Sequence, residues 1–120
     1  MSQTVVEKIA QAHMTEGPGR PLRTGDVISL RPRHVMTHDN TAAVMGKFRS
    51  LGVPGIKDPR QPVFTLDHDI QNTSGANLAK YADIEAFARE QGVDFYPAGT
   101  GIGHQTMVSM GYVVPGALAV

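Results

Sequence analysis

The strongest constraint on the fold is an alternation of short β-prone runs with a segment of helical period. Residues 63–66 form a short β-prone run, residues 78–88 repeat apolar side chains at helical spacing, and residues 93–96 are again β-prone. Gly92 stands between the helical segment and the second run, where a glycine commonly ends a helix. Strand, helix and strand in this order are typical of an α/β domain. We therefore expect a mostly parallel sheet flanked by helices.

The segments before that unit fit the same plan. Thr4 and Glu7 have the spacing of a capping box, so a short helix is expected to follow them. Residues 27–31 alternate like a strand. One of residues 39–41 can cap a further helix, and Gly52 sits where a glycine would end that helix.

The segments after the unit supply a glycine-rich loop and an apolar end. Residues 99–103 contain three glycines but fail the dinucleotide-binding spacing, so they indicate a tight turn with close backbone approach. Backbone amides of this turn are candidates to hold a substrate carboxylate where a helix starts. We expect that short helix to begin at His104, and residues 117–120 to form a strand. The helical stripe is expected to face the core, and its members are Leu78, Tyr81, Ile84 and Phe87.

The charge balance and hydropathy exclude several classes of partner. Eleven basic and eleven acidic side chains give zero formal charge, which argues against a protein that binds phosphate backbones. No apolar run reaches the roughly 20 residues of a membrane span, and the first residues lack the pattern of a secretory leader. We therefore expect neither a nucleic-acid partner nor a membrane partner.

The length and the lack of cysteine bound the domain organisation. We expect residues 1–120 to form a single α/β domain or fragment. A chain without cysteine makes no disulfide and offers no thiolate to zinc or to an iron–sulfur cluster. We expect a cytoplasmic protein, or a protein of the mitochondrial matrix if a transit peptide has been removed.

Three of the five histidines lie in polar turns and are candidates for chemistry. His68 is flanked by Asp67 and Asp69 directly after an expected strand, and His104 follows the glycine loop after another. Because the carboxyl ends of parallel strands share one edge of a sheet, we expect His68 and His104 at the same edge. His38 precedes an expected helix. A carboxylate beside an imidazole suits general acid–base catalysis, since it fixes the ring and raises its basicity.

Structural interpretations stand beside these functional ones. His13 and His34 are expected to be solvated or hydrogen-bonded residues without a chemical role. The neighbour of His38, Asp39, is a candidate helix cap. Asp67 and His68 are adjacent in sequence, and adjacent side chains usually point apart. A metal site is a further alternative, although no zinc-type spacing is present and we assign no metal ligand; its candidate residues are His38, Asp39, Asp67, His68, Asp69 and His104.

Three motifs carry a resemblance to a known family. They read VMTHDNT at residues 35–41, DHDIQN at residues 67–72 and FYPAGTGIGHQ at residues 95–105. In this order and spacing the chain resembles, over nearly its whole length, the amino-terminal domain of the aconitase superfamily. That superfamily includes the large subunit of 3-isopropylmalate dehydratase. Residues 58–61 and 71–72 look closest to the homoaconitase branch.

The resemblance implies a hydro-lyase that isomerises a hydroxy-polycarboxylic acid by dehydration and rehydration. In the family a [4Fe–4S] cluster acts as Lewis acid on the substrate. The resemblance implies that His68, paired with Asp67, assists protonation of the departing hydroxyl, and that His104 is a second catalytic histidine. It also implies a substrate-binding role near a carboxylate for a second set of residues, namely His38, Asp39 and Thr41.

The departures from the family pattern are large. The family's Asp-Ser-His element, its three cluster cysteines and its swivelling domain with a serine base all lie outside these 120 residues. The chain alone is therefore expected to be inactive and to bind no cluster through its own residues. Its expected partners are the rest of the large subunit, a swivelling small domain or subunit, and a small hydroxy-carboxylic acid. Two alternatives remain open: a non-catalytic interaction module that uses the apolar end, and a small metal-dependent hydrolase.

Overall fold

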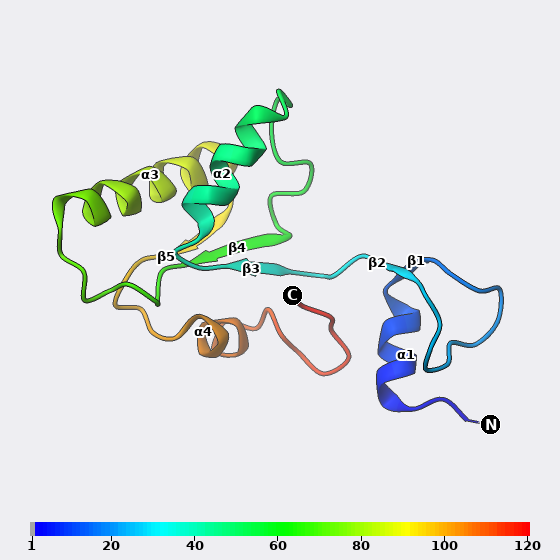
Figure 1. Ribbon diagram of the computed structural model, residues 1–120. Coiled ribbons are helices and arrows are strands. Elements are labelled where there is room, and N and C mark those ends of the chain that lie inside the picture. Colours follow the sequence, from blue (N-terminus) through cyan, green and yellow to red (C-terminus); the bar gives the residue numbers. More distant parts are fainter. Residues whose placement is uncertain (1) are drawn as a thin grey trace.

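A computed structural model gives the structure of residues 2–120, in which a small amino-terminal lobe projects from an α/β body (Figure 1). The principal extents are 57 × 33 × 22 Å, and the radius of gyration is 17.0 Å. A compact domain of this length has a radius of gyration of about 14 Å. The chain is thus elongated because the lobe stands away from the body.

The lobe contains α1 (Val5–Ala12), β1 (Met14–Glu16) and β2 (Ser29–Leu30), and its two strands pair antiparallel. The expected capping box is confirmed. The Thr4 hydroxyl accepts from the backbone N–H of Glu7 at 3.2 Å, and the Glu7 carboxylate accepts from the Thr4 N–H at 2.7 Å.

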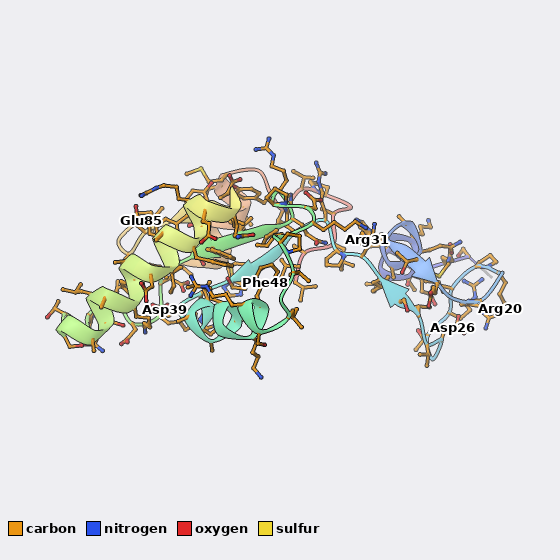
Figure 2. The ribbon with its side chains drawn as sticks, turned by 90° about the horizontal axis from the view of Figure 1, so that it is seen from above. Arg20, Asp26, Arg31, Asp39, Phe48 and Glu85 are labelled. Atoms are coloured by element: carbon orange, nitrogen blue, oxygen red, sulfur yellow. The ribbon has the colours of Figure 1, made fainter. Side chains whose placement is uncertain are left out.

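The remainder of the lobe is a loop closed by an ion pair. Arg20 and Asp26 lie at the far end of the lobe and pair at 2.7 Å (Figure 2). The strand expected over residues 27–31 covers only Ser29–Leu30 and belongs to this lobe, not to the parallel sheet. A proline follows at position 32, so the chain leaves the lobe there without continuing the ladder.

The body is built on a parallel sheet of β3 (Val35–Thr37), β4 (Pro62–Thr65) and β5 (Asp94–Tyr96), in the order β3-β4-β5. The expected α/β class with a parallel sheet is confirmed. β3 was not among the expected strands. It runs from His34 straight into the polar residues 38–40 with no glycine or proline to mark its ends, whereas the equally short β5 stands between Gly92 and Pro97.

Helices cover both faces of this sheet. α2 (Thr41–Ser50) and α3 (Gly75–Gln91) lie on one face, and α4 (Gly103–Ser109) lies on the other (Figure 1). Gly52 and Gly92 follow α2 and α3 with φ of 65° and 71°, as the sequence predicts for glycines that end helices. Within residues 2–120, no helix combines the length and apolar character needed to cross a bilayer.

The core lies between the sheet and the pair α2 and α3. Ile84 and Phe87 are buried as expected, but Leu78 is 55% exposed, so the expectation that it faces the core is wrong. The reason is visible in Figure 1, where the first turns of α3 extend beyond the strands. The core residues are Met45, Phe64, Leu66, Ile84, Phe87, Ala88 and Val93.

The apolar end of the chain lies beside β3. Ala119 and His34 form a single parallel bridge, so residues 117–120 do not make the full strand that was expected. The Val120 carbonyl accepts from the Met36 N–H at 2.7 Å, and the Val120 N–H donates to the His34 carbonyl at 3.1 Å. This segment therefore covers the outer edge of β3.

The packing of α3 against the core can be tested by substitution. Ile84 is fully buried, so Ile84→Ala is expected to lower the free energy of unfolding by about 2–5 kcal/mol. Leu78→Ala on the same helix is the control and is expected to change it by no more than about 0.5 kcal/mol. Urea denaturation of both variants measures the difference, and equal losses would contradict this packing.

Candidate active site at the carboxyl ends of the strands

Polar turns follow the parallel strands where each strand ends. His38 and Asp39 come directly after β3, Asp67 and His68 come after β4, and the glycine loop that ends at Gly103 comes after β5. Since neighbouring parallel strands end at the same edge of the sheet, the three turns meet there.

Asp67 joins two of these turns through its carboxylate. Oδ1 lies 2.5 Å from Nδ1 of His68, and Oδ2 accepts the backbone N–H of Gly103 at 2.6 Å. The Asp67 side chain is 5% exposed, whereas the His68 ring is 55% exposed. These neighbours therefore do not point apart, contrary to the general tendency. The carboxylate holds Nδ1, which leaves Nε2 of His68 for chemistry.

Gly103 permits this close approach because it has no side chain. A Cβ at this position would lie 2.5 Å from the Thr65 hydroxyl oxygen, 3.0 Å from Oδ2 of Asp67 and 3.1 Å from the Met36 sulfur. The expectation of close backbone approach in the glycine loop is confirmed here. The Gly103 N–H is already bound by the protein's own carboxylate, so this amide is not the expected binding group for a substrate carboxylate.

Asp39 binds the backbone of the second turn. Its Oδ2 accepts the N–H of His68 at 2.7 Å and the N–H of Asp67 at 3.2 Å, and its Oδ1 accepts the hydroxyl of Tyr81. Burial opposes ionisation of this carboxyl, but the hydrogen bonds outweigh burial and lower its pKa below the usual value. The interpretation of Asp39 as a helix cap is wrong, because the cap position of α2 is Asn40.

The two histidines of these turns stack on each other. The ring centroids of His38 and His68 are 3.9 Å apart, with 23° between the ring planes. Nδ1 of His38 is buried and has no hydrogen-bond partner within residues 2–120. The two imidazole rings thus lie stacked at this edge of the sheet.

This geometry suits hydrogen bonding and proton transfer better than a metal centre. One ligand atom each from His38, Asp39 and His68 lie within 4.8 Å of one another. Imidazole nitrogens direct their lone pairs in the ring plane, so stacked rings do not aim at a common ion. The Asp39 oxygens already accept three hydrogen bonds, and Asp69 pairs with Lys80 at 3.6 Å.

Two of the expected site residues make no hydrogen bond to the rings of the stacked pair within residues 2–120. Thr41 is fully buried, and its hydroxyl donates to the His38 carbonyl at 2.5 Å. It therefore closes the His38 turn and is inaccessible to a ligand in this structure. His104 is exposed on α4 and lines an apolar cavity of about 440 Å³ with Met36 and Val120.

The two remaining histidines have structural partners, as the sequence predicts. Nδ1 of His13 lies 2.9 Å from the Ile9 carbonyl, and its Nε2 accepts the Leu118 N–H at 3.4 Å. Nδ1 of His34 lies 3.1 Å from the Arg60 carbonyl. His13 thereby links the lobe to the body.

Sequence reasoning missed Tyr81 as a site residue. Its position in the helical stripe indicated a core side chain, and its ring does pack against the core. The signal was the hydroxyl, because a partly buried tyrosine usually finds a hydrogen-bond partner. Nothing in the sequence identified Asp39, which lies 42 positions earlier, as that partner.

Comparisons with known proteins agree with the motifs at this edge. The aconitase family (aconitate hydratase) matches residues 7–120. The chain is 56% identical over 119 residues to the mitochondrial homoaconitase of Yarrowia lipolytica, covering 98% of this chain and 17% of that protein. It is 55% identical over 119 residues to the mitochondrial homoaconitases of Cryptococcus neoformans and Neurospora crassa, covering 98% of this chain and 16% and 15% of those proteins.

Gly103 provides a direct test of the Asp67 contact. Gly103→Ala is expected to lower the free energy of unfolding by about 1–3 kcal/mol, because the new methyl group would push the Thr65 hydroxyl and the Asp67 carboxylate away from residue 103. Gly46→Ala is the matched control, since Gly46 lies inside α2 with open space around it. That variant is expected to be more stable by roughly 0.5–1 kcal/mol. A Gly103→Ala chain as stable as the wild type in urea would contradict the contact.

The lowered pKa of Asp39 predicts how stability depends on pH. A carboxyl with a folded pKa below its unfolded pKa stabilises the fold above the unfolded pKa, and this stabilisation disappears as pH falls through the folded pKa. Asp39→Asn is therefore expected to be less stable than the wild type at pH 7, with a difference that shrinks below about pH 4. Urea midpoints at pH 7, 5 and 3 measure it; a constant difference would argue against an ionised Asp39.

Proposed function

Because this chain belongs to the aconitase family, we propose that it supplies the amino-terminal part of a hydro-lyase of the homoaconitase type. The chain spans about 16% of the length of the curated relatives it matches. The observation that supports the proposal best is the Asp67–His68 pair, held at 2.5 Å and tied to the start of α4. A histidine ring that is hydrogen-bonded to a carboxylate through one nitrogen and exposed to solvent is suited to donate a proton.

The proposed reaction removes water from a hydroxy-polycarboxylic acid and returns it at the adjacent carbon. In the first step the C–O bond breaks, and the electron pair leaves with the oxygen. Protonated His68 gives its Nε2 proton to the departing hydroxyl, which leaves as water. A base outside this sequence removes a proton from the neighbouring carbon, and the electrons of that C–H bond form the C=C bond. Addition of water in the opposite sense gives the isomer.

The other residues of this edge take supporting roles in the proposal. His38, stacked on His68 at 3.9 Å, is proposed to bind a substrate carboxylate. Asp39 and Thr41 are buried, so we assign them to positioning these histidines instead of direct contact with substrate. His104 is proposed as the second catalytic histidine, contributed from α4.

The cluster of the family does not fit the residues of this chain. The sequence contains no cysteine, so none of its residues can serve as a thiolate ligand. We propose that the [4Fe–4S] cluster, which acts as a Lewis acid in this family, is held by polypeptide outside this sequence. A swivelling domain or small subunit is proposed to complete the site.

The relatives also bear on location and on the alternatives. Their names describe mitochondrial proteins, so we propose the mitochondrial matrix, and they give no support to a cytoplasmic location. The stacked histidine rings do not support the alternative of a metal-dependent hydrolase. No observation supports the alternative of a non-catalytic interaction module. The apolar end that it would use, residues 117–120, lies against β3.

A chimaera tests the proposed function. This sequence would replace the matching segment of the Yarrowia lipolytica homoaconitase, and dehydration of homocitrate would be followed. We expect the chimaera to be active, His68→Gln to lower kcat by about 10²–10⁴-fold, and the 120-residue chain alone to be inactive. His34→Gln is the control and is expected to keep full activity. Unchanged kcat in His68→Gln, or dehydration by the isolated chain, would refute the assignment.

A further inference from the structure

We propose that Tyr81 is a positioning residue that acts through Asp39 to set the relative placement of His38 and His68. The inference rests on the proposed function, in which these histidines bind and protonate the substrate. It assigns a role to a residue of α3 that contacts neither histidine ring in the hydrogen bonds and ring pairs of residues 2–120.

The first step of the argument is that one carboxylate joins the two histidine turns. Asp39 follows His38 directly in the chain, so the backbone of one turn carries it. Its Oδ2 accepts the N–H groups of Asp67 and His68 at 3.2 and 2.7 Å, which belong to the other turn. Any movement of the Asp39 carboxylate therefore changes the distance between the two turns.

The second step is that Tyr81 fixes the orientation of this carboxylate. The Tyr81 hydroxyl donates to Oδ1, the oxygen that the backbone N–H groups do not use. Burial raises the pKa of Tyr81, and the hydrogen bond to Asp39 raises it further, so the hydroxyl keeps its proton throughout the neutral range. Asp39 lies beside α3 and the start of α2 in the body (Figure 2).

The third step is that the helix carrying Tyr81 is itself held firmly. Ile84, Phe87 and Ala88 of α3 are all buried in the core, one to two turns after Tyr81. The tyrosine ring packs against the same core. The Tyr81 hydroxyl therefore links this helix to Asp39 and, through Asp39, to both histidine turns. Asn77 of the same helix holds the His68 turn alone, by donating to the Asp69 and Asn72 carbonyls at 3.2 and 2.8 Å.

Removing the hydroxyl would release this linkage without removing the packing. In Tyr81→Phe the ring remains, but Oδ1 of Asp39, a residue only 8% exposed, loses its donor. The carboxylate then turns toward water or another donor, and its bonds to the second turn weaken. The expected result is a looser spacing of the two imidazoles in a protein that still folds.

The chain offers a closely matched control. The Tyr112 hydroxyl donates to an Asp94 carboxylate oxygen at 2.6 Å and lies 2.8 Å from the Tyr96 hydroxyl. Asp94 begins β5, whereas the candidate site lies where the strands end. Tyr112→Phe therefore also removes a tyrosine–aspartate hydrogen bond, but one at the end of the sheet opposite His38 and His68; the histidine that Tyr112 contacts is His34.

The first test is spectroscopic and independent of activity. Proton NMR of the 120-residue chain is expected to show cross-relaxation between the His38 and His68 rings, which Tyr81→Phe weakens at least twofold and Tyr112→Phe leaves unchanged. If Tyr81→Phe does not fold, Asp39→Asn is the second variant and is expected to lose the same signal. An unchanged ring–ring signal in a folded Tyr81→Phe chain, or equal loss in Tyr112→Phe, overturns the proposal.

The second test separates positioning from binding in the active chimaera. Tyr81→Phe is expected to lower kcat by about 10–100-fold, with KM within about twofold of the unsubstituted chimaera. Tyr112→Phe is expected to change neither. If the ring signal responds but His68→Gln leaves kcat intact, the proposed function fails and the positioning pair stands. If kcat of Tyr81→Phe is unchanged while His68→Gln is inactive, the positioning role fails alone.

Discussion

The site depends on one carboxylate that accepts two hydrogen bonds at once. Asp67 holds Nδ1 of His68 on one oxygen and the Gly103 N–H on the other. A carboxylate 5% exposed needs such partners, because an unpaired charge removed from water is costly. The parallel sheet brings the turns after β4 and β5 together, and the missing side chain of Gly103 lets them touch. The orientation of His68 follows from these two contacts.

A second carboxylate, that of Asp39, has a different role from that of Asp67. Asp67 orients a ring, whereas Asp39 orients backbone, and both lie at the carboxyl ends of neighbouring parallel strands. Their donors are three backbone amides, a tyrosine hydroxyl and an imidazole, so the carboxylate oxygens are held largely by neutral groups. This arrangement keeps His68 exposed while its support is buried, which is the division expected of a group that must meet a substrate.

The sequence predicted the parts of this site that rest on local patterns. The strand expected at residues 63–66, which the structure has as β4 over Pro62–Thr65, follows from a run of a few residues. So do the glycine that ends α3 and the meeting of a histidine turn with a glycine loop. β3 was missed because no glycine or proline marks its ends, as Gly92 and Pro97 mark those of the equally short β5. Local sequence patterns did not reveal the roles of Asp39 and Tyr81, because their contact spans 42 positions and forms only when α3 packs on the sheet. Leu78 fits the helical stripe, yet it is exposed because that stripe extends past the sheet.

The tautomer of His68 is the most direct test of the account. If Asp67 holds Nδ1, the neutral ring carries its proton on Nδ1 and leaves Nε2 unprotonated. Nitrogen-15 NMR of the chain, recorded at alkaline pH, distinguishes the two ring nitrogens of His68 by their chemical shifts. A protonated Nδ1 and a bare Nε2 are the predicted result. A proton on Nε2 would contradict the account, because Asp67 would then not be orienting the ring for proton transfer.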